Sequence, residues 1–327
     1  MNTTVMQTPQ LSKGRLVLLG SSSVVLCLSF IMSVFAPFPL ALAYILYGRT
    51  LGFVTGLAGI AASYLFATFV FQEPVLFWFY VGVFVLGTAI SEIVTRNMAP
   101  VKGVVMIGLG FILTVFAAGA IYLHSRHMTL ENYVIDQMNK SKAVIEEKKK
   151  VIEQSPDKDA IQVLQLLDRP DLLAKDFKDS VPGYFFMGVF ILLWFNTFLA
   201  LKSRRLLLSA QDYPYSERNL LNFKVPFVFV FVLIAGLVLA IWGNQMGYGD
   251  LEPVGFTLIR CIGIFYFFQG FGVMSDLLNF LGIMGLFRSI LVMIVILMAN
   301  YLIAAAGLFD NWFDFRKYFV KRNTDLE

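Results

Sequence analysis

The chain has 327 residues, of which 58% are apolar or aromatic and 15% are charged. Soluble globular chains carry about 45–50% apolar and about 25% charged residues, so lipid is the expected solvent for most of this protein. The net charge of +4 comes from 26 basic and 22 acidic residues, and the Lys and Arg side chains stand in short loops beside apolar runs. This composition excludes disordered, collagen-like and disulfide-scaffold proteins and argues against a nucleic-acid partner; the lipid bilayer is the expected partner.

Charges and prolines divide the sequence into eight apolar runs, each long enough to cross a hydrocarbon core about 30 Å thick. The runs cover residues 16–36, 51–71, 75–93, 103–123, 181–201, 225–242, 254–274 and 289–308. A ninth stretch, 38–48, has only 11 residues and follows Pro37, so it is either a short tilted span or a half-helix buried among the others. The predicted fold is therefore all-α, a polytopic membrane helical bundle of eight to nine transmembrane segments with a helical hydrophilic insert. We expect an amino-terminal membrane half (1–123), an extracytoplasmic insert (124–180), a carboxyl-terminal membrane half (181–308) and an amphipathic tail (309–327).

Lys and Arg residues in short loops resist translocation and therefore indicate the cytoplasmic side. Lys13 places the amino terminus in the cytoplasm, and Arg96 and Lys102 fall on the same side if 38–48 crosses the membrane. The loop 72–74 carries Glu73 and no basic residue, so we expect it outside. Nine crossings place the carboxyl tail outside although it is rich in Lys and Arg, whereas an even number places it inside; the sequence leaves both open. The expected location is the bacterial inner (cytoplasmic) membrane.

The segment 124–180 is the only long polar stretch, and its acidic and basic residues balance. Apolar residues recur at helical spacing from Leu130 to Ile152, which predicts an amphipathic helix of about 25 residues. Ser155 and Pro156 end this helix, and a shorter one follows. The insert is either a solvated spacer that packs on the membrane domain or a docking surface for a protein partner.

No hydrolase, kinase, nucleotide-binding or zinc-protease motif occurs, so no catalytic residue and no cofactor are predicted. His124 and His127 are the only histidines. Their spacing allows two ligands on one helical face, but two ligands at a membrane edge make a weak metal site, and none is predicted.

Ionisable residues inside apolar runs are the most informative side chains, because a charge in lipid needs a partner or water. Glu92 lies near the end of its run, where pairing with Arg96 at i+4 is a sufficient structural explanation. Arg260 lies deeper and has no acid within a helical turn. Asn300 and Asp310 lie at comparable depth when counted from the other end of the last run, which makes each a candidate partner of Arg260.

Arg260, Gln269, Asn300 and Asp310 are therefore the candidate ligand-binding residues. Arg260 either faces a cavity and meets an anionic ligand or locks two helices together through a structural pair. For Gln269 and Asn300, hydrogen bonds between helices are the ordinary alternative.

Several short motifs follow one another in the carboxyl-terminal half: Val181-Pro182-Gly183, Asn196, Lys202-Ser203-Arg204-Arg205, Val225-Pro226, Phe268-Gln269-Gly270, Gly307-Leu308-Phe309-Asp310 and Asp314-Phe315-Arg316. Their order resembles the YybS-like family of predicted bacterial membrane proteins, which has no established biochemical function. The membrane core of that family is similar to the S-components of energy-coupling-factor vitamin transporters, which bind a vitamin or a metal near the outer face. The stretch 37–48 fits this comparison, whereas the run 16–36 lacks the Ala-x-x-x-Ala docking pattern of those proteins.

Two functions from different classes follow. The first is a multi-pass membrane protein that binds or transports a small solute through an S-component-like core. The alternative is a scaffold or assembly factor that docks a protein partner through the insert 124–180.

Overall fold

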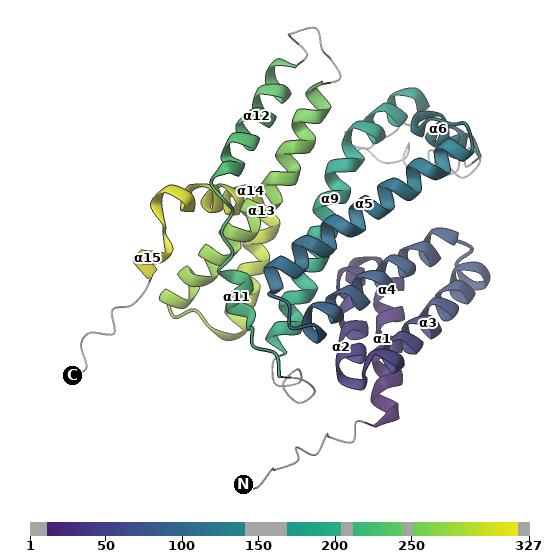
Figure 1. Ribbon diagram of the computed structural model, residues 1–327, viewed down its shortest axis with the longest axis horizontal. Helices are drawn as coiled ribbons and strands as arrows, with labels where there is room; N and C mark the ends of the chain where they lie inside the picture. Colours follow the sequence, from purple (N-terminus) through teal and green to yellow (C-terminus); the bar gives the residue numbers. More distant parts are fainter. Residues whose placement is uncertain (1–11, 141–168, 204–211, 244, 246–250, 320–327) are drawn as a thin grey trace, which may run out of the picture. The chain divides into compact units, whose positions relative to one another are not determined.

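The computed structural model describes residues 12–140, 169–203, 212–243, 245 and 251–319 (Figure 1). Every regular element in these residues is a helix, in agreement with the all-α prediction. The chain divides into two compact units: the first comprises Met1–Leu109, Gly188–Val225 and Ile264–Glu327, and the second comprises Gly110–Met187 and Pro226–Gly263. The boundary falls within three long helices that contribute to both units, namely α5 (Pro100–Ser125), α9 (Pro170–Lys202) and α13 (Leu251–Phe280).

Six helices of the described residues are long and apolar enough to cross a membrane. They are Arg49–Val70, Val75–Thr95, Pro100–Ser125, Asp171–Lys202, Leu251–Phe280 and Gly285–Phe313. These helices coincide with six of the eight expected full-length runs. The expected count of eight to nine segments is therefore not confirmed, and the other two runs differ from the prediction for identifiable reasons.

The run 16–36 is not one helix. The helix α1 (Lys13–Leu28) ends before Ser29, whose backbone is extended (φ −86°, ψ 96°), and a 3₁₀ turn, η1 (Phe30–Phe35), leads into α2 (Pro37–Tyr47). The hydroxyl of Ser29 donates to the carbonyl oxygen of Leu26 at 3.0 Å, a local bond that competes with helix continuation. The hydropathy of this run predicts its length but not the break in its helix.

The run 225–242 is shortened at its start. Here the helix α12 (Val228–Trp242) has 15 residues, or about 22 Å at about 1.5 Å per residue, which is shorter than the hydrocarbon core. Pro226 has no amide hydrogen to donate, and the amide of Val225 donates to a side chain of α13 instead of to a helical carbonyl.

The short stretch 38–48 forms α2, which is buried inside the first unit. It packs against α1, α3 (Arg49–Leu65) and α4 (Pro74–Thr95), and Leu40, Ala41 and Ala43 are fully buried. A π-helical turn, η2 (Phe66–Val70), continues α3. Glycine at position 52 of α3 permits this packing, because a Cβ atom there would overlap Tyr44 of α2.

The hydrophilic insert is only partly within the described residues. Its first part contains α6 (Leu130–Lys140), and its last part, from Pro170, is continuous with the membrane helix α9. Residues 141–168, which hold most of the expected helical hairpin, lie outside the described residues. The insert as a separate domain therefore stays a prediction.

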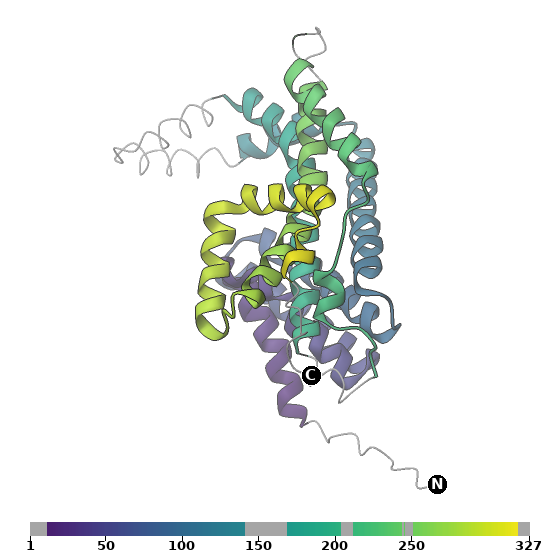
Figure 2. The same ribbon diagram turned by 90° about the vertical axis from the view of Figure 1, so that its left-hand side faces the viewer.

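A bend in α14 (Gly285–Phe313) determines which residues meet in the first unit. Ala299 has non-helical angles (φ −134°, ψ 31°), so the helix turns sharply there, as the yellow-green and yellow helix of Figure 2 shows. The second half of α14 then crosses α13 at Gly270 and Gly307. A Cβ atom on Gly270 would overlap the carbonyl oxygen of Ile303, and one on Gly307 would overlap that of Tyr266. The two backbones are in direct contact only because both positions lack a side chain.

Candidate functional site

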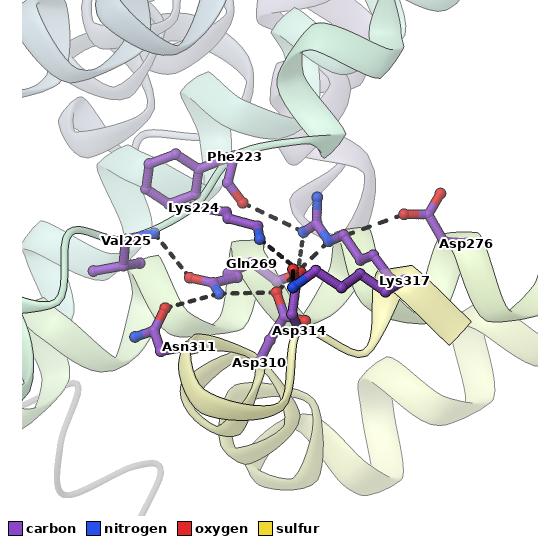
Figure 3. A network of polar contacts seen from close by, with 10 residues as sticks. Phe223, Lys224, Val225, Gln269, Asp276, Asp310, Asn311, Asp314 and Lys317 are labelled. Atoms are coloured by element: carbon purple, nitrogen blue, oxygen red, sulfur yellow. Dashed lines mark hydrogen bonds and ion pairs between the residues drawn. The ribbon is translucent and has the colours of Figure 1, made fainter. Parts of the chain in front are cut away.

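Five polar side chains gather beside the contact between α13 and α14 in the first unit, and we call them the polar centre: Gln269, Asp276, Asp310, Asn311 and Arg316 (Figure 3). The first two lie on α13, the next two near the end of α14, and the last at the start of α15 (Arg316–Phe319). Glycine at positions 270 and 307 lets the helices approach closely enough for short polar side chains to meet between them.

Gln269 is completely buried and connects three segments of the chain. Its Oε1 atom accepts a hydrogen bond from the amide of Val225 at 2.8 Å. Its Nε2 atom donates to Asp310 Oδ2 and to Asn311 Oδ1, each at 3.1 Å. The side chain of Gln269 therefore joins the segment before α12 and the end of α14 to the middle of α13.

Arg316 enters the polar centre from the turn that follows α14. Asp314 occupies the left-handed region (φ 44°), which ends the helix and reverses the chain. The guanidinium Nη2 donates to the carbonyl oxygens of Phe223 (3.3 Å) and Gln269 (3.1 Å). A Cβ atom on Gly272 would overlap the carbonyl oxygen of Leu221 and lie 2.7 Å from this Nη2 atom, so glycine makes room for both the loop and the arginine.

The two carboxylates of the polar centre share this guanidinium. Arg316 Nε lies 3.7 Å from Asp310 Oδ2 and 3.9 Å from Asp276 Oδ2. The side chain of Asp310 is 0% exposed and that of Asp276 is 35% exposed, so the first is in a much drier environment. Asp310 Oδ1 and Arg316 Nε are both buried without a hydrogen bond. An acceptor and a donor of opposite charge are thus both unsatisfied in the interior of the first unit.

A second, exposed ion pair fixes the chain reversal beside the polar centre. Asp314 accepts hydrogen bonds from Lys224 and from Lys317, each at 2.8 Å. These two contacts lower the pKa of the Asp314 carboxyl to about 2. We call the contacts of Asp314 with Lys224 and Lys317 the Asp314 clasp. Because Lys224 belongs to the segment that precedes α12, the clasp joins the same two segments that Gln269 joins in the interior.

The other two candidate ligand residues are not part of the polar centre. Asn300 directly follows the bend in α14 and is exposed. Arg260 belongs to the second unit, where its guanidinium carbon lies 4.3 Å from the ring centroid of Tyr184 and 5.9 Å from that of Phe256, in cation–π geometry.

Asp310 has partners within its own unit, whereas the expected contact of Arg260 with Asp310 or Asn300 joins the two units and stays a prediction. The contact with Arg260 is expected from depth alone, counted along the apolar runs, which takes no account of a bend in α14. The bend at Ala299 instead directs the end of α14 across α13 at Gly270. Asp310 therefore meets Gln269 and Arg316 within its own unit.

Glu92 and Arg96 form an ion pair in the structure, with Arg96 Nε 2.6 Å from Glu92 Oε2. Two further residues join them, and neither was predicted from the sequence. The hydroxyl of Tyr44 donates to Glu92 Oε1 at 2.7 Å, and Arg49 Nη2 donates to Glu92 Oε2 at 3.1 Å. The cluster ties the end of α2 and the start of α3 to the end of α4.

Sequence reasoning missed Arg316 and Asn311 as members of the polar centre. Arg316 was counted among the charges of the tail, because it lies beyond the last apolar run. The spacing Asp310-x-x-x-Asp314-x-Arg316 is recognisable as a motif in the sequence. However, Arg316 reaches Asp310 only because the left-handed turn at Asp314 reverses the chain. Among the described residues, no group of three or more His, Cys, Asp or Glu side chains is arranged to hold a metal ion.

Residues 16–311 match the model of a protein family described as "Predicted membrane protein (DUF2232)". No curated protein and no solved structure shows a comparable match. The matched span includes Gln269, Asp310 and Asn311 and ends before Arg316. Its extent, together with six apolar helices of membrane-spanning length, leads to one conclusion: the chain belongs to the DUF2232 family of predicted membrane proteins.

Proposed function

We propose that this membrane protein binds a small polar solute at the polar centre and moves it across the bacterial inner membrane through a core similar to that of S-components. Polar and ionisable side chains inside a membrane protein are costly, and they usually serve either a structural pair or a substrate pathway. The arrangement around Asp310 supports the second role.

The proposal depends on one observation, the two unsatisfied charged groups of the polar centre. Asp310 Oδ1 is a buried acceptor without a donor, and Arg316 Nε is a buried donor without an acceptor. A buried polar group without a partner costs about 1–3 kcal/mol, and more when it is charged. A purely structural pair removes this cost by aligning the two groups, whereas a binding site leaves them for a solute.

The geometry favours a solute that carries a hydrogen-bond donor and an acceptor close together. Arg316 Nε lies 3.7 Å from Asp310 Oδ2, and the unsatisfied oxygen, Oδ1, belongs to the same carboxylate, so one polar group of a solute can reach both residues. The glycine contact between α13 and α14 keeps the site narrow, which favours a small polar group over a bulky apolar one.

Thermal-shift measurements on the purified full chain test the proposal, with a panel of vitamins, nucleosides and phospholipid headgroups as probes. We expect at least one probe to raise the melting temperature of the wild type and to lose this effect in the Asp310→Asn variant. Glu73→Gln is the matched control, because Glu73 is exposed in the loop before α4 and has no contact with the polar centre.

Size-exclusion chromatography establishes that Asp310→Asn is folded before its response is interpreted. If no probe stabilises the wild type, or if Asp310→Asn responds to the same probe as strongly as the wild type, solute binding at the polar centre is wrong.

A further inference from the structure

Arg260 of α13 carries a positive charge that its own unit does not neutralise. Among the described residues of the second unit, its half-buried side chain takes part in no hydrogen bond and no ion pair. Glu252 lies eight residues earlier on α13, about 12 Å along the helix axis. Asp179 of α9 lies five residues before Tyr184, the ring beside Arg260, and about 140° around the helix from it. The anion that Arg260 requires therefore comes from outside this unit.

The guanidinium of Arg260 is held in place by two adjacent residues of α9. A Cβ atom on Gly183 would lie 2.9 Å from Cδ of Arg260, so glycine makes room for the stem of the arginine. The ring of Tyr184 then lies against the face of the guanidinium, with 4.3 Å between the ring centroid and the guanidinium carbon. The five N–H donors of an arginine lie in the plane of the guanidinium, so this contact leaves all of them for an oxygen-rich ligand.

The guanidinium points toward the start of α13. The ring of Phe256, one turn nearer that start, lies 5.9 Å from the guanidinium carbon. The helix has 30 residues, about 45 Å, and when centred on a hydrocarbon core of about 30 Å it extends about 8 Å beyond each side. Arg260 is nine residues, or about 14 Å, from Leu251, so its Cα atom lies about 6 Å inside the core. A long side chain that leans toward the amino end of its helix reaches the headgroups from this depth.

The sequence of α9 indicates the same depth independently. Its first part carries a charged residue in almost every turn as far as Asp179, whereas residues 180–201 carry none. Tyr184 therefore lies about 7 Å beyond the last charged residue, near the surface of the bilayer. Its side chain is exposed, as expected of the tyrosines that line this boundary in membrane proteins. Phospholipid phosphates are the anions found at this level.

From these contacts we infer that Arg260 and Tyr184 form a binding site for the phosphate of an anionic phospholipid. The guanidinium donates two parallel hydrogen bonds to phosphate oxygens, and the ring of Tyr184 fixes the plane in which they lie. The acyl chains lie along exposed apolar side chains nearby, including Val254 and Phe256. A headgroup without a cation, such as that of phosphatidylglycerol, neutralises the arginine, whereas choline brings a positive charge of its own.

Melting temperatures of the full chain in detergent micelles test the inference, with dioleoyl phosphatidylglycerol or dioleoyl phosphatidylcholine as the added lipid. We define the headgroup effect as the melting temperature with the first lipid minus that with the second. We expect it to be about 3 °C in the wild type and to be lost in Arg260→Gln. Arg126→Gln is the matched control and should keep the effect. Arg126 also lies over a tyrosine, Tyr122, but it is exposed just after the end of α5.

Two variants of Tyr184 test the site even if Arg260→Gln does not fold. Tyr184→Phe keeps the ring and should keep the headgroup effect. Tyr184→Leu removes the ring that orients the guanidinium and should reduce the effect by at least half. The side chain of Tyr184 is 58% exposed, so neither change removes buried packing. Soluble glycerol phosphate is the probe for a free phosphate and should not change the melting temperature, because it has no acyl chains to hold it at this depth.

Four outcomes would overturn the inference. They are a wild type without a headgroup effect, an effect of equal size in Arg260→Gln or in Tyr184→Leu, an equal loss in Arg126→Gln, and stabilisation by glycerol phosphate as large as that by the lipid. The third would show a general attraction of anionic lipid to basic residues, and the fourth a site for a free anion.

The result is separable from that of the solute panel, because Asp310 belongs to the first unit and Arg260 to the second. Asp310→Asn should keep the headgroup effect, and its loss there would place the lipid at the polar centre and overturn the inference. A headgroup effect that depends on Arg260, with no solute that depends on Asp310, supports the lipid site and counts against the proposed function.

Discussion

At the scale of single residues, the polar side chains inside the apolar helices bind to chain segments that leave the regular helix. The amide of Asn196 donates to the carbonyl oxygen of Val34 in the 3₁₀ turn at 2.8 Å. The hydroxyl of Ser23 donates to the carbonyl oxygen of Ala36 at 2.8 Å, and Gln269 accepts from the amide of Val225. Each bond satisfies a backbone group that a regular helix would pair internally.

Gln269→Leu should lower the free energy of unfolding by about 2 kcal/mol, because it leaves the amide of Val225 and the carboxylate of Asp310 without their partner. Leucine keeps the volume of the side chain and removes only its polar groups. Reversible unfolding in detergent measures the change. Gln137→Leu is the control, since Gln137 is exposed on α6. Equal stabilities of the two variants would contradict a structural role for Gln269.

The clasp of Asp314 predicts a dependence of stability on acidic pH. Lys224 and Lys317 lower the pKa of Asp314 to about 2, below the value of about 3.9 for an unperturbed Asp. Ionised Asp314 therefore stabilises the fold fully above about pH 4, and this stabilisation is lost as the pH falls toward about 2. The melting temperature of Asp314→Asn should lie below that of the wild type at neutral pH, and the difference should shrink below about pH 4.

Asparagine suits this test because it tolerates the left-handed angle at position 314 (φ 44°). Adding Lys224→Met to Asp314→Asn should change the neutral-pH stability little, because the lysine has already lost its partner. A difference between wild type and Asp314→Asn that does not vary with pH would show that the clasp contributes nothing through its charge.

At the scale of elements, the bend in α14 and the glycines at its crossing with α13 decide the contacts. Gly270 and Gly307 permit backbone contact between α13 and α14. Trp194 of α9 stacks on Phe268 of α13, with 4.3 Å between the ring centroids. The Gln-Gly motif of α13 and the Gly-x-x-Asp motif of α14 therefore act together. The glycines allow the helices to approach, and the neighbouring polar residues form hydrogen bonds between them.

Gly270→Ala should destabilise the fold by about 3 kcal/mol, because its Cβ atom would overlap the backbone of Ile303 and separate α13 from α14. Gly263→Ala in the same helix is the matched control. A Cβ atom there meets nothing within 4 Å, and alanine favours a helix over glycine by about 1 kcal/mol, so this variant should be neutral or stabilising. Thermal unfolding of both proteins in detergent decides the comparison; equal effects would mean that the crossing is not tightly packed.

At the scale of the whole molecule, the arrangement of charge predicts how the chain is oriented in the membrane. The α4 helix has 22 residues, about 33 Å at about 1.5 Å per residue, and so is long enough to separate its two flanking loops by a bilayer. Glu73 lies at its start, and Arg96 and Lys102 lie around its end. The excess of basic residues predicts that the second loop lies in the cytoplasm.

Cysteine labelling tests this orientation in a protein whose Cys27 and Cys261 are replaced by alanine. Glu73→Cys should react with a membrane-impermeant maleimide in right-side-out vesicles, and Met98→Cys should react only after the vesicles are permeabilised. Reaction of both positions from the same side would show that α4 does not cross the membrane.

The sequence predicted the helical class, six of the membrane helices and the polar residues that need partners, because these properties follow from composition and spacing along the chain. Gln269 and Asp310 stand out as candidate site residues, since polar groups in apolar runs are recognisable without a structure. Their mutual contact was not predictable, because the helix breaks at Ala299, where no proline or glycine indicates a break. Interruptions at Ser29 and before Val228 were missed for a related reason: hydropathy reports the solvent that a segment prefers but not where its backbone hydrogen bonds change partner.

By itself, then, the sequence determined the environment of this protein: a chain with 58% apolar residues in long runs can satisfy its backbone in lipid only as helices. Only the tertiary structure decided that Arg316, outside every apolar run, enters the interior and lies 3.7 Å from Asp310. The reason is physical. Solvent preference is a local property of each segment, whereas the partner of a buried charge depends on bends and glycine contacts that bring distant segments together.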